Sequence, residues 1–225
     1  MYGVTLAIIE ILIFAISAIS VKYNIDSLKN ISGFVYYWTM FTILTGLWEV
    51  CFILNYDSVR NDSINFIKNK THVWTSDYNV TYLLPWKFSD IFYAEYGSYA
   101  DREYMALGDD WSRTIEGTHA IFCGIFSFYS ILLKVQGYER NYLIALSVAM
   151  GAQLMNSILY LINYFIEVNN LHSVNNDTPD FPAGQFLCER PFMYVNVFWF
   201  LMPSVIILIE LINNYKKNDI EYSKV

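Results

Sequence analysis

The stretch LGDDWSRTIEGTH, residues 107–119, joins a polar, acidic segment to a long apolar run and carries Glu116 into that run. A charged group at membrane depth is costly and usually faces the interior of a helix bundle. Glu116 is therefore a candidate functional residue. Asp109 and Asp110 precede Glu116 in the same stretch. The dipole at the N-terminus of a helix favours carboxylates, and we interpret these two residues as the start of a helix.

The overall composition is that of a membrane protein. Of the 225 residues, 55% are hydrophobic and 18% aromatic, and the mean hydropathy is +0.30, which is more apolar than an ordinary soluble domain. The net charge of −7 leaves no basic surface that could neutralise phosphates, so nucleic acid is not an expected partner. The three cysteines are scattered, with neither Cys-x-x-Cys spacing nor clustered histidines, and no metal site is expected.

Five apolar runs are each long enough, with their flanks, to cross a bilayer as a helix. They predict an all-α integral membrane protein, a single domain built as a five-transmembrane-helix bundle. The predicted spans are at about residues 4–21, 31–55, 114–133, 142–168 and 192–212. The first run contains Glu10 and has no basic n-region and no clear cleavage site, so we interpret it as a retained helix rather than a signal peptide.

The segment between the second and third spans, residues 56–113, is polar and aromatic. It is too long for a bare loop, and it predicts short helices of its own at about 90–96 and 101–107. It also contains three N-glycosylation sequons, and another precedes the last span. The sequon asparagines are Asn61, Asn69, Asn79 and Asn176. Residues 213–225 predict a solvated tail.

The basic residues of three short segments that flank the spans share one side of the predicted bundle. They lie in the loop after the first span, the loop after the third span and the tail: Lys22, Lys29, Lys134, Arg140, Lys216, Lys217 and Lys224. The positive-inside rule makes this side cytosolic, with a lumenal N-terminus and a cytosolic C-terminus. Residues 56–113 and the sequons at Asn61, Asn69, Asn79 and Asn176 then fall on the lumenal side, where glycosylation occurs.

Polar groups also recur at one depth of the predicted bundle. Under this topology the lumenal half of the membrane contains Glu10, Glu49, Glu116, Asn163 and Asn196. Because these residues come from five different spans, we expect them to surround an intramembrane cavity, which is where helix bundles build their sites.

The residues around this predicted cavity suit acid–base chemistry. Two carboxylates in a low-dielectric pocket can have pKa values pushed apart, so that one donates a proton and the other accepts one or stabilises a cation. His119 lies three residues after Glu116 on the same helix face and could relay the proton. Trp48, Tyr104 and Trp199 offer aromatic faces that stabilise a desolvated cation by roughly 2 kcal/mol in favourable cases.

Each of these residues also has a purely structural interpretation. A glutamate can hydrogen-bond to a neighbouring helix, a histidine can be satisfied inside the bundle, and aromatic rings can pack or anchor the membrane interface. Thr42, Thr45 and Glu49 share one helix face, which should look into protein rather than lipid in either case. Several polar groups at one depth favour the functional interpretation.

A series of short motifs follows the predicted spans in order. They are Trp48-Glu49, then Glu95-Tyr96-Gly97 with Ala100-Asp101, the run from Tyr104 to Asp109, Glu116, and the run from Asn196 to Trp199 followed by Pro203. Their order and spacing, from about Thr45 to Glu210, resemble the emopamil-binding protein family. This family comprises the sterol Δ8-Δ7 isomerases and their emopamil-binding-like relatives, in the wider EXPERA group. The resemblance implies a five-helix protein of the endoplasmic reticulum membrane.

The resemblance also implies roles for individual residues. Glu49 and Glu116 match the family's two functional carboxylates, Asn196 and Trp199 match groups of the fifth helix, and Tyr104 matches a pocket tyrosine across a one-residue insertion. The family protonates a sterol double bond, passes through a carbocation and releases a neighbouring proton, without a cofactor. The implied partners are a sterol substrate, cationic amphiphilic amines as mimics of the cation, and the lipid bilayer, with a homodimer left open.

One departure leaves the activity open. The family has a histidine at the position of Thr45 and a threonine at that of His119, so the two groups are exchanged between helices. Our hypothesis is that His119 takes over the role of the missing histidine. We expect a sterol Δ8-Δ7 isomerase with the catalytic residues Glu49, Glu116 and His119, and with the substrate-binding residues Thr45, Trp48, Tyr104, Asn196 and Trp199.

Two other functions compete with this expectation. The first is a non-catalytic emopamil-binding-like protein that binds sterols or amphiphilic amines, and Thr45 is the feature that favours it. The second is a proton-coupled transporter. It is disfavoured because no span shows the Gly/Pro-interrupted pairs or inverted repeats that are typical of such folds.

Overall fold

The computed structural model describes residues 1–100, 110–168 and 193–222. Within these residues every regular element is a helix, and the one strand-like pairing is an isolated bridge between Tyr2 and Asp77. The predicted all-α fold is therefore confirmed for the described part of the chain.

Five long helices are apolar enough to cross a membrane by length and composition. They correspond one to one to the predicted runs: α1 (Gly3–Asn24), α3 (Gly33–Leu54), α7 (Asp110–Val135), α8 (Glu139–Val168) and α10 (Met193–Tyr222). The chain is accordingly a multi-pass membrane protein by composition. The last helix differs from the prediction, because it continues through most of the expected tail, where no glycine or proline ends it.

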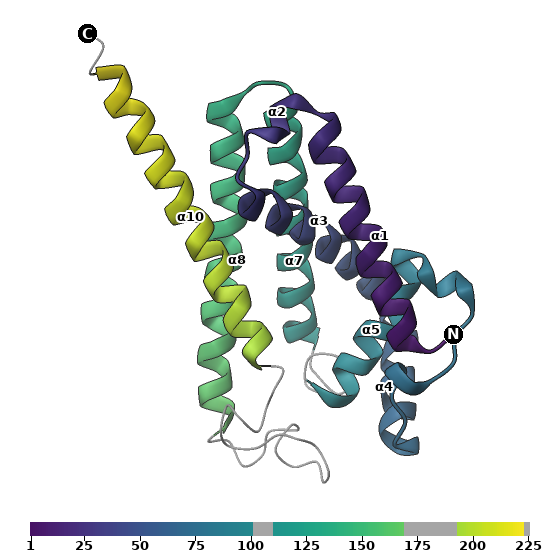
Figure 1. Cartoon of the computed structure of the whole chain (residues 1–225). Helices are drawn as coiled ribbons and strands as arrows, with labels where there is room; N and C mark the ends of the chain where they lie inside the picture. The colour runs from purple at the N-terminus through teal and green to yellow at the C-terminus, as the bar shows by residue number, and fades with distance from the viewer. Residues whose placement is uncertain (101–109, 169–192, 223–225) are drawn as a thin grey trace.

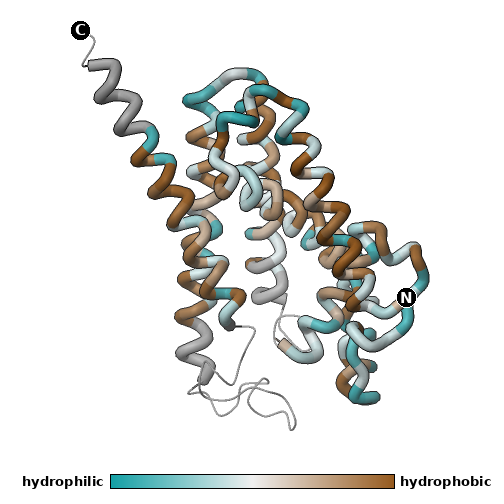
Figure 2. Tube along the Cα trace, viewed as in Figure 1, coloured by the Kyte–Doolittle hydropathy of each residue, from teal (hydrophilic) through white to brown (hydrophobic). Residues whose placement is uncertain are grey.

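The surface of the long helices agrees with a lipid environment. Large apolar side chains are exposed along α1 and α10, as in Ile11, Ile16 and Leu208, and both helices are predominantly apolar along much of their length in Figure 2. An exposed apolar surface of this extent is unusual for a soluble monomer and is what the hydrocarbon core of a bilayer covers.

Four of the long helices form the body of the molecule. Helices α7 and α8 lie side by side, α3 packs against α7, and α10 packs along α8 (Figure 1). The turn between α7 and α8 contains Gly137 with φ of 83°, a left-handed conformation that glycine adopts without steric cost. The short helix α2 (Asp26–Lys29) connects α1 to α3, and the Lys22 ammonium donates to the carbonyls of Leu28 and Ile31.

The close approach of α3 to α7 depends on two glycines. A Cβ atom on Gly46 would lie 2.8 Å from Gly124 Cα and 3.1 Å from the Ala120 carbonyl oxygen. Both neighbours are backbone atoms and cannot move aside independently. A side chain at this crossing would therefore push the two helices apart, and with them the residues that follow on α3.

We expect Gly46→Ala to lower the stability of the protein by about 1–3 kcal/mol, the usual cost of overpacking. The matched control is Gly151→Ala on α8, where an added Cβ would meet no atom within 4 Å and alanine is the better helix former. Thermal unfolding of both variants in detergent checks this. Equal melting temperatures for the two variants would contradict the crossing described above.

A peripheral lobe, defined as residues 56–99, lies beside the long helices. It comprises α4 (Tyr56–Asn69), the 3-10 turns η1 (Val73–Thr75) and η2 (Val80–Leu83), and α5 (Pro85–Tyr99). The predicted helix at 90–96 lies within α5, which starts earlier because Pro85 suits the first turn of a helix. The predicted helix at 101–107 lies outside the described residues.

Hydrogen bonds hold the lobe together and attach it to α1. The Ser63 hydroxyl on α4 donates to the Ala94 carbonyl of α5 at 2.9 Å. The Glu95 carboxylate accepts from the Val73 amide at 2.9 Å and contacts His72 Nδ1 at 2.8 Å. The Gly3 amide of α1 donates to the Ser76 carbonyl at 3.1 Å. Residues 56–99 are thus a folded unit in which α5 has a fixed position.

Candidate functional site

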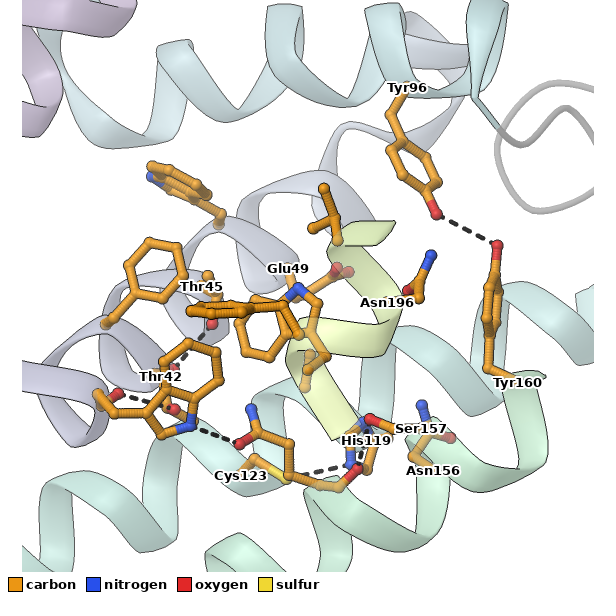
Figure 3. Close-up of a pocket in the computed structure, with 18 of the residues that line it drawn as sticks. Thr42, Thr45, Glu49, Tyr96, His119, Cys123, Asn156, Ser157, Tyr160 and Asn196 are labelled. Atoms are coloured by element: carbon orange, nitrogen blue, oxygen red, sulfur yellow. Dashed lines mark hydrogen bonds between the residues drawn. The ribbon is translucent and has the colours of Figure 1, made fainter. Parts of the chain in front are cut away.

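A cavity of about 590 Å³ lies between α3, α5, α7, α8 and α10 (Figure 3). This volume is in the range of small-molecule sites, which is about 300–1,000 Å³. Aromatic rings and a few polar groups line it. The polar and titratable side chains in its wall are Thr42, Thr45, Glu49, Tyr93, Tyr96, His119, Cys123, Gln153, Asn156, Ser157, Tyr160 and Asn196.

Most of the site residues predicted from the sequence meet in this cavity. Its wall contains Thr45, Trp48, Glu49, His119, Asn196 and Trp199. Their roles stay predictions, since position alone does not test chemistry. Tyr104 lies outside the described residues. The same holds for the side chain of Glu116, although its backbone belongs to α7, one residue before Gly117.

The expectation that all five spans surround the cavity is wrong for α1. Glu10 is buried, with 3% of its surface exposed, but it does not line the cavity, because α1 packs mainly against η1, η2 and α2. Helix α5 of the peripheral lobe takes that place in the wall. The side chain of Asn163, also expected at this depth, is outside the described part.

Glu49 lies in the C-terminal third of α3 and is 7% exposed. Its Oε1 atom accepts a hydrogen bond from the Tyr93 hydroxyl on α5. Its Oε2 atom lies 3.6 Å from the position that a Cβ on Gly117 would occupy. The carboxylate is thus held between α5 and α7. It has room beside α7 because Gly117, the residue after Glu116, has no side chain.

The position of Tyr93 follows from how α5 packs on α3. The Ser89 hydroxyl donates to the Trp48 carbonyl at 2.7 Å, and the rings of Phe52 and Tyr93 are 4.8 Å apart. Burial raises the pKa of Tyr93 well above its usual value of 10, and the nearby charge of Glu49 raises it further. The phenol therefore keeps its proton and is the donor to Glu49.

Aromatic rings from α3 and α10 form another part of the wall. Trp199 lies 4.7 Å from Trp38 and stacks on Phe41 at 5.6 Å, and Phe198 meets Trp38 at 5.7 Å, all between ring centroids. The indole nitrogen of Trp38 donates to the Gln153 side chain at 2.8 Å. A carboxylate and several aromatic faces around one cavity suit a ligand with a cationic centre.

His119 and Thr45 line the same cavity from α7 and α3 (Figure 3). The Nε2 atom of His119 is 3.2 Å from the Cys123 sulfur, and this thiol also reaches the Ala149 carbonyl of α8 at 3.5 Å. The Thr45 hydroxyl donates to the Thr42 carbonyl of its own helix at 3.1 Å. Thr45 and His119, the two positions at which the resemblance implies an exchange of threonine and histidine, therefore line one cavity.

The sequence interpretation missed a polar stripe on α8. Gln153, Asn156, Ser157 and Tyr160 have the i, i+3, i+4, i+7 spacing of one helix face, and all four line the cavity. This helical spacing inside an apolar run was a usable signal. The Tyr160 hydroxyl lies 3.3 Å from that of Tyr96, so the stripe also connects α8 to α5.

Comparison with protein-family models, curated proteins and solved structures finds no match for this chain. The resemblance to the emopamil-binding protein family therefore stays a prediction.

Proposed function

We propose that the chain is a sterol Δ8-Δ7 isomerase of the endoplasmic reticulum membrane. The observation that carries this proposal is the buried carboxylate of Glu49 in the wall of an aromatic cavity that also contains His119. Acid–base groups in an apolar cavity are what a proton transfer to and from a lipid requires, because water is excluded and charge interactions are strong there.

The proposed reaction is a proton addition followed by a proton loss. An acid in the cavity gives its proton to carbon 9 of the sterol, and the two electrons of the Δ8 double bond form the new C–H bond, which leaves a cation at carbon 8. A base then removes a proton from carbon 7, and the electrons of that bond form the Δ7 double bond. The reaction is redox-neutral and requires no cofactor.

The proposed groups for these steps are Glu49, Glu116 and His119. The aromatic faces of Trp38 and Trp199 stabilise the cation between the two steps, while Thr45, Trp48, Tyr104 and Asn196 belong to the substrate site. The same features predict an affinity for cationic amphiphilic amines, whose protonated nitrogen carries a stable charge where the reaction forms a transient one.

The proposed orientation has a lumenal N-terminus and a cytosolic C-terminus. The sequon asparagines Asn61, Asn69 and Asn79 are all exposed on the peripheral lobe, as the glycosylation of a lumenal lobe would require. Lys134 forms an ion pair with Glu139 at the turn between α7 and α8, on the side that the positive-inside rule makes cytosolic.

The alternative function is the binding of sterols or amphiphilic amines without turnover. It is favoured by the hydroxyl of Thr45, which donates to its own helix and offers neither an acid nor a base. His119 also has a neighbour in the Cys123 thiol. A protein of this kind would keep the aromatic cavity and the carboxylate but release its sterol unchanged.

Expression of the protein in cells that lack a sterol Δ8-Δ7 isomerase tests the proposal. We expect the Δ8 sterols of these cells to be converted to Δ7 sterols and their products, measured by gas chromatography and mass spectrometry. Continued accumulation of Δ8 sterols at full expression would overturn the isomerase proposal, and saturable amine binding in the same membranes would then support the alternative.

A further inference from the structure

We infer that Tyr93 is a positioning residue that holds Glu49 as an anion inside the cavity. Glu49 is then the group that accepts a proton or faces a cation, and the proton that starts the reaction comes from another group. The second statement rests on the proposed function, whereas the first concerns only the Tyr93–Glu49 pair.

The pair joins two elements that are distant in the sequence. Glu49 belongs to α3 and Tyr93 to α5 of the peripheral lobe, 44 residues further along the chain. Helix α5 is attached to α3 beside the pair through the Ser89–Trp48 hydrogen bond and the Phe52–Tyr93 ring contact. These two contacts fix the position of the Tyr93 side chain, so that its hydroxyl points toward the Glu49 carboxylate.

The direction of this hydrogen bond determines which form of Glu49 is favoured. A phenol has one proton to donate, and burial keeps the pKa of Tyr93 high enough for it to retain that proton. A hydrogen bond from a neutral donor to a carboxylate is stronger than one to a carboxylic acid, and it stabilises the ionised form. The Tyr93 hydroxyl, as a donor to Glu49 Oε1, thus stabilises the ionised form of this carboxylate.

Other titratable groups around the pair come from each packed element. In the described part of the chain they are Cys51 on α3, Tyr96 on α5, His119 and Cys123 on α7, and Tyr160 on α8. Of these residue types, histidine is the one whose reference pKa in water lies near neutrality. With Glu49 held as an anion, the proton donor of the proposed reaction is His119 or Glu116.

Infrared difference spectroscopy of the purified full-length protein in lipid nanodiscs tests the inference without a substrate. The C=O stretch of a protonated carboxylic acid is separate from the bands of a carboxylate. The band of Glu49 is identified as the one that Glu49→Gln removes. We expect the wild-type spectrum at pH 7 to contain the carboxylate bands of Glu49 and no acid band.

Titration of Tyr93→Phe provides the second measurement. We expect the acid band of Glu49 to appear at a pH about one to two units higher than in the wild type, as the loss of a hydrogen bond to a charged group predicts. The matched control is Tyr96→Phe on the same helix, whose hydroxyl faces Tyr160 instead and whose titration should follow the wild type.

Two outcomes would overturn the inference. One is an acid band of Glu49 in the wild type at pH 7, a result that does not depend on whether any tyrosine variant folds. The other is an identical titration of Glu49 in Tyr93→Phe and Tyr96→Phe. Neither outcome bears on whether the wild-type protein isomerises a sterol, so a failure here is distinct from a failure of the proposed function.

Discussion

Glu49→Gln is expected to lower the conversion of a Δ8 sterol by roughly 10²–10⁴-fold, the usual contribution of a positioned acid or base. Glutamine preserves the size of the side chain and can still accept the hydrogen bond of Tyr93. It carries no charge and cannot take up a proton at neutral pH. The loss would therefore reflect the chemistry of the carboxylate and not the packing of α3 on α5.

The measurement uses purified protein in nanodiscs, with a Δ8 sterol in heavy water. Mass spectrometry gives the amount of Δ7 product and its deuterium content. The matched control is Glu95→Gln, which replaces a glutamate of equal exposure, 7%, that binds the Val73 amide and does not line the cavity. Wild-type turnover in Glu49→Gln would remove this carboxylate from the mechanism.

His119→Ala is expected to abolish isomerisation while ligand binding is largely retained. The hypothesis assigns to His119 the role of a histidine that α3 lacks at Thr45, and both residues line one cavity. Removal of the imidazole takes away a group for proton transfer but leaves Glu49 and the aromatic wall of Trp38 and Trp199. Catalysis and binding should therefore separate in this variant.

Binding is measured as the increase in melting temperature on addition of N,N-dimethyldodecylamine, with the uncharged N-dodecylacetamide as the reference probe. His72→Ala is the control variant, because His72 lies on the peripheral lobe and contacts Glu95 rather than the cavity. Retained turnover in His119→Ala would contradict the hypothesis that His119 replaces the histidine that α3 lacks at Thr45. A double variant, Thr45→His with His119→Thr, should recover turnover if the imidazole can act from either helix.

The long helices could be predicted from the sequence because hydropathy reports directly on what a membrane span requires. All five apolar runs became helices, and the shared face of Thr42, Thr45 and Glu49 lines the cavity as helical spacing predicts. The ends of the helices were harder to predict from the sequence. The polar composition of residues 213–222 predicts a tail, but α10 continues through them because no glycine or proline ends the helix there.

The contribution of the peripheral lobe could not be predicted in the same way. Tyr93 lies in a polar segment whose position relative to the spans depends on contacts such as Ser89 with Trp48 and Glu95 with Val73. These contacts join residues that are 22 to 41 positions apart, and no periodicity in the sequence reports them. The burial of Glu10 away from the cavity has the same origin, because α1 packs on the lobe.

The crossing of α3 and α7 was also missed, although its residues were visible. Gly46 and Gly124 lie in separate apolar runs, and only the fold shows that they touch. This contact sets how closely Glu49 approaches the start of α7. The depth of a polar residue in the membrane could thus be predicted from the topology. The residues that it contacts could be identified only from the packing of the helices.

The conversion of a Δ8 sterol by the wild-type protein in heavy water tests the central proposal most directly. We predict a Δ7 product with one deuterium at carbon 9, because the first step adds a solvent-derived proton at that carbon and the second removes one from carbon 7. Recovery of unchanged Δ8 sterol from folded protein that still binds N,N-dimethyldodecylamine would contradict the proposed isomerase function.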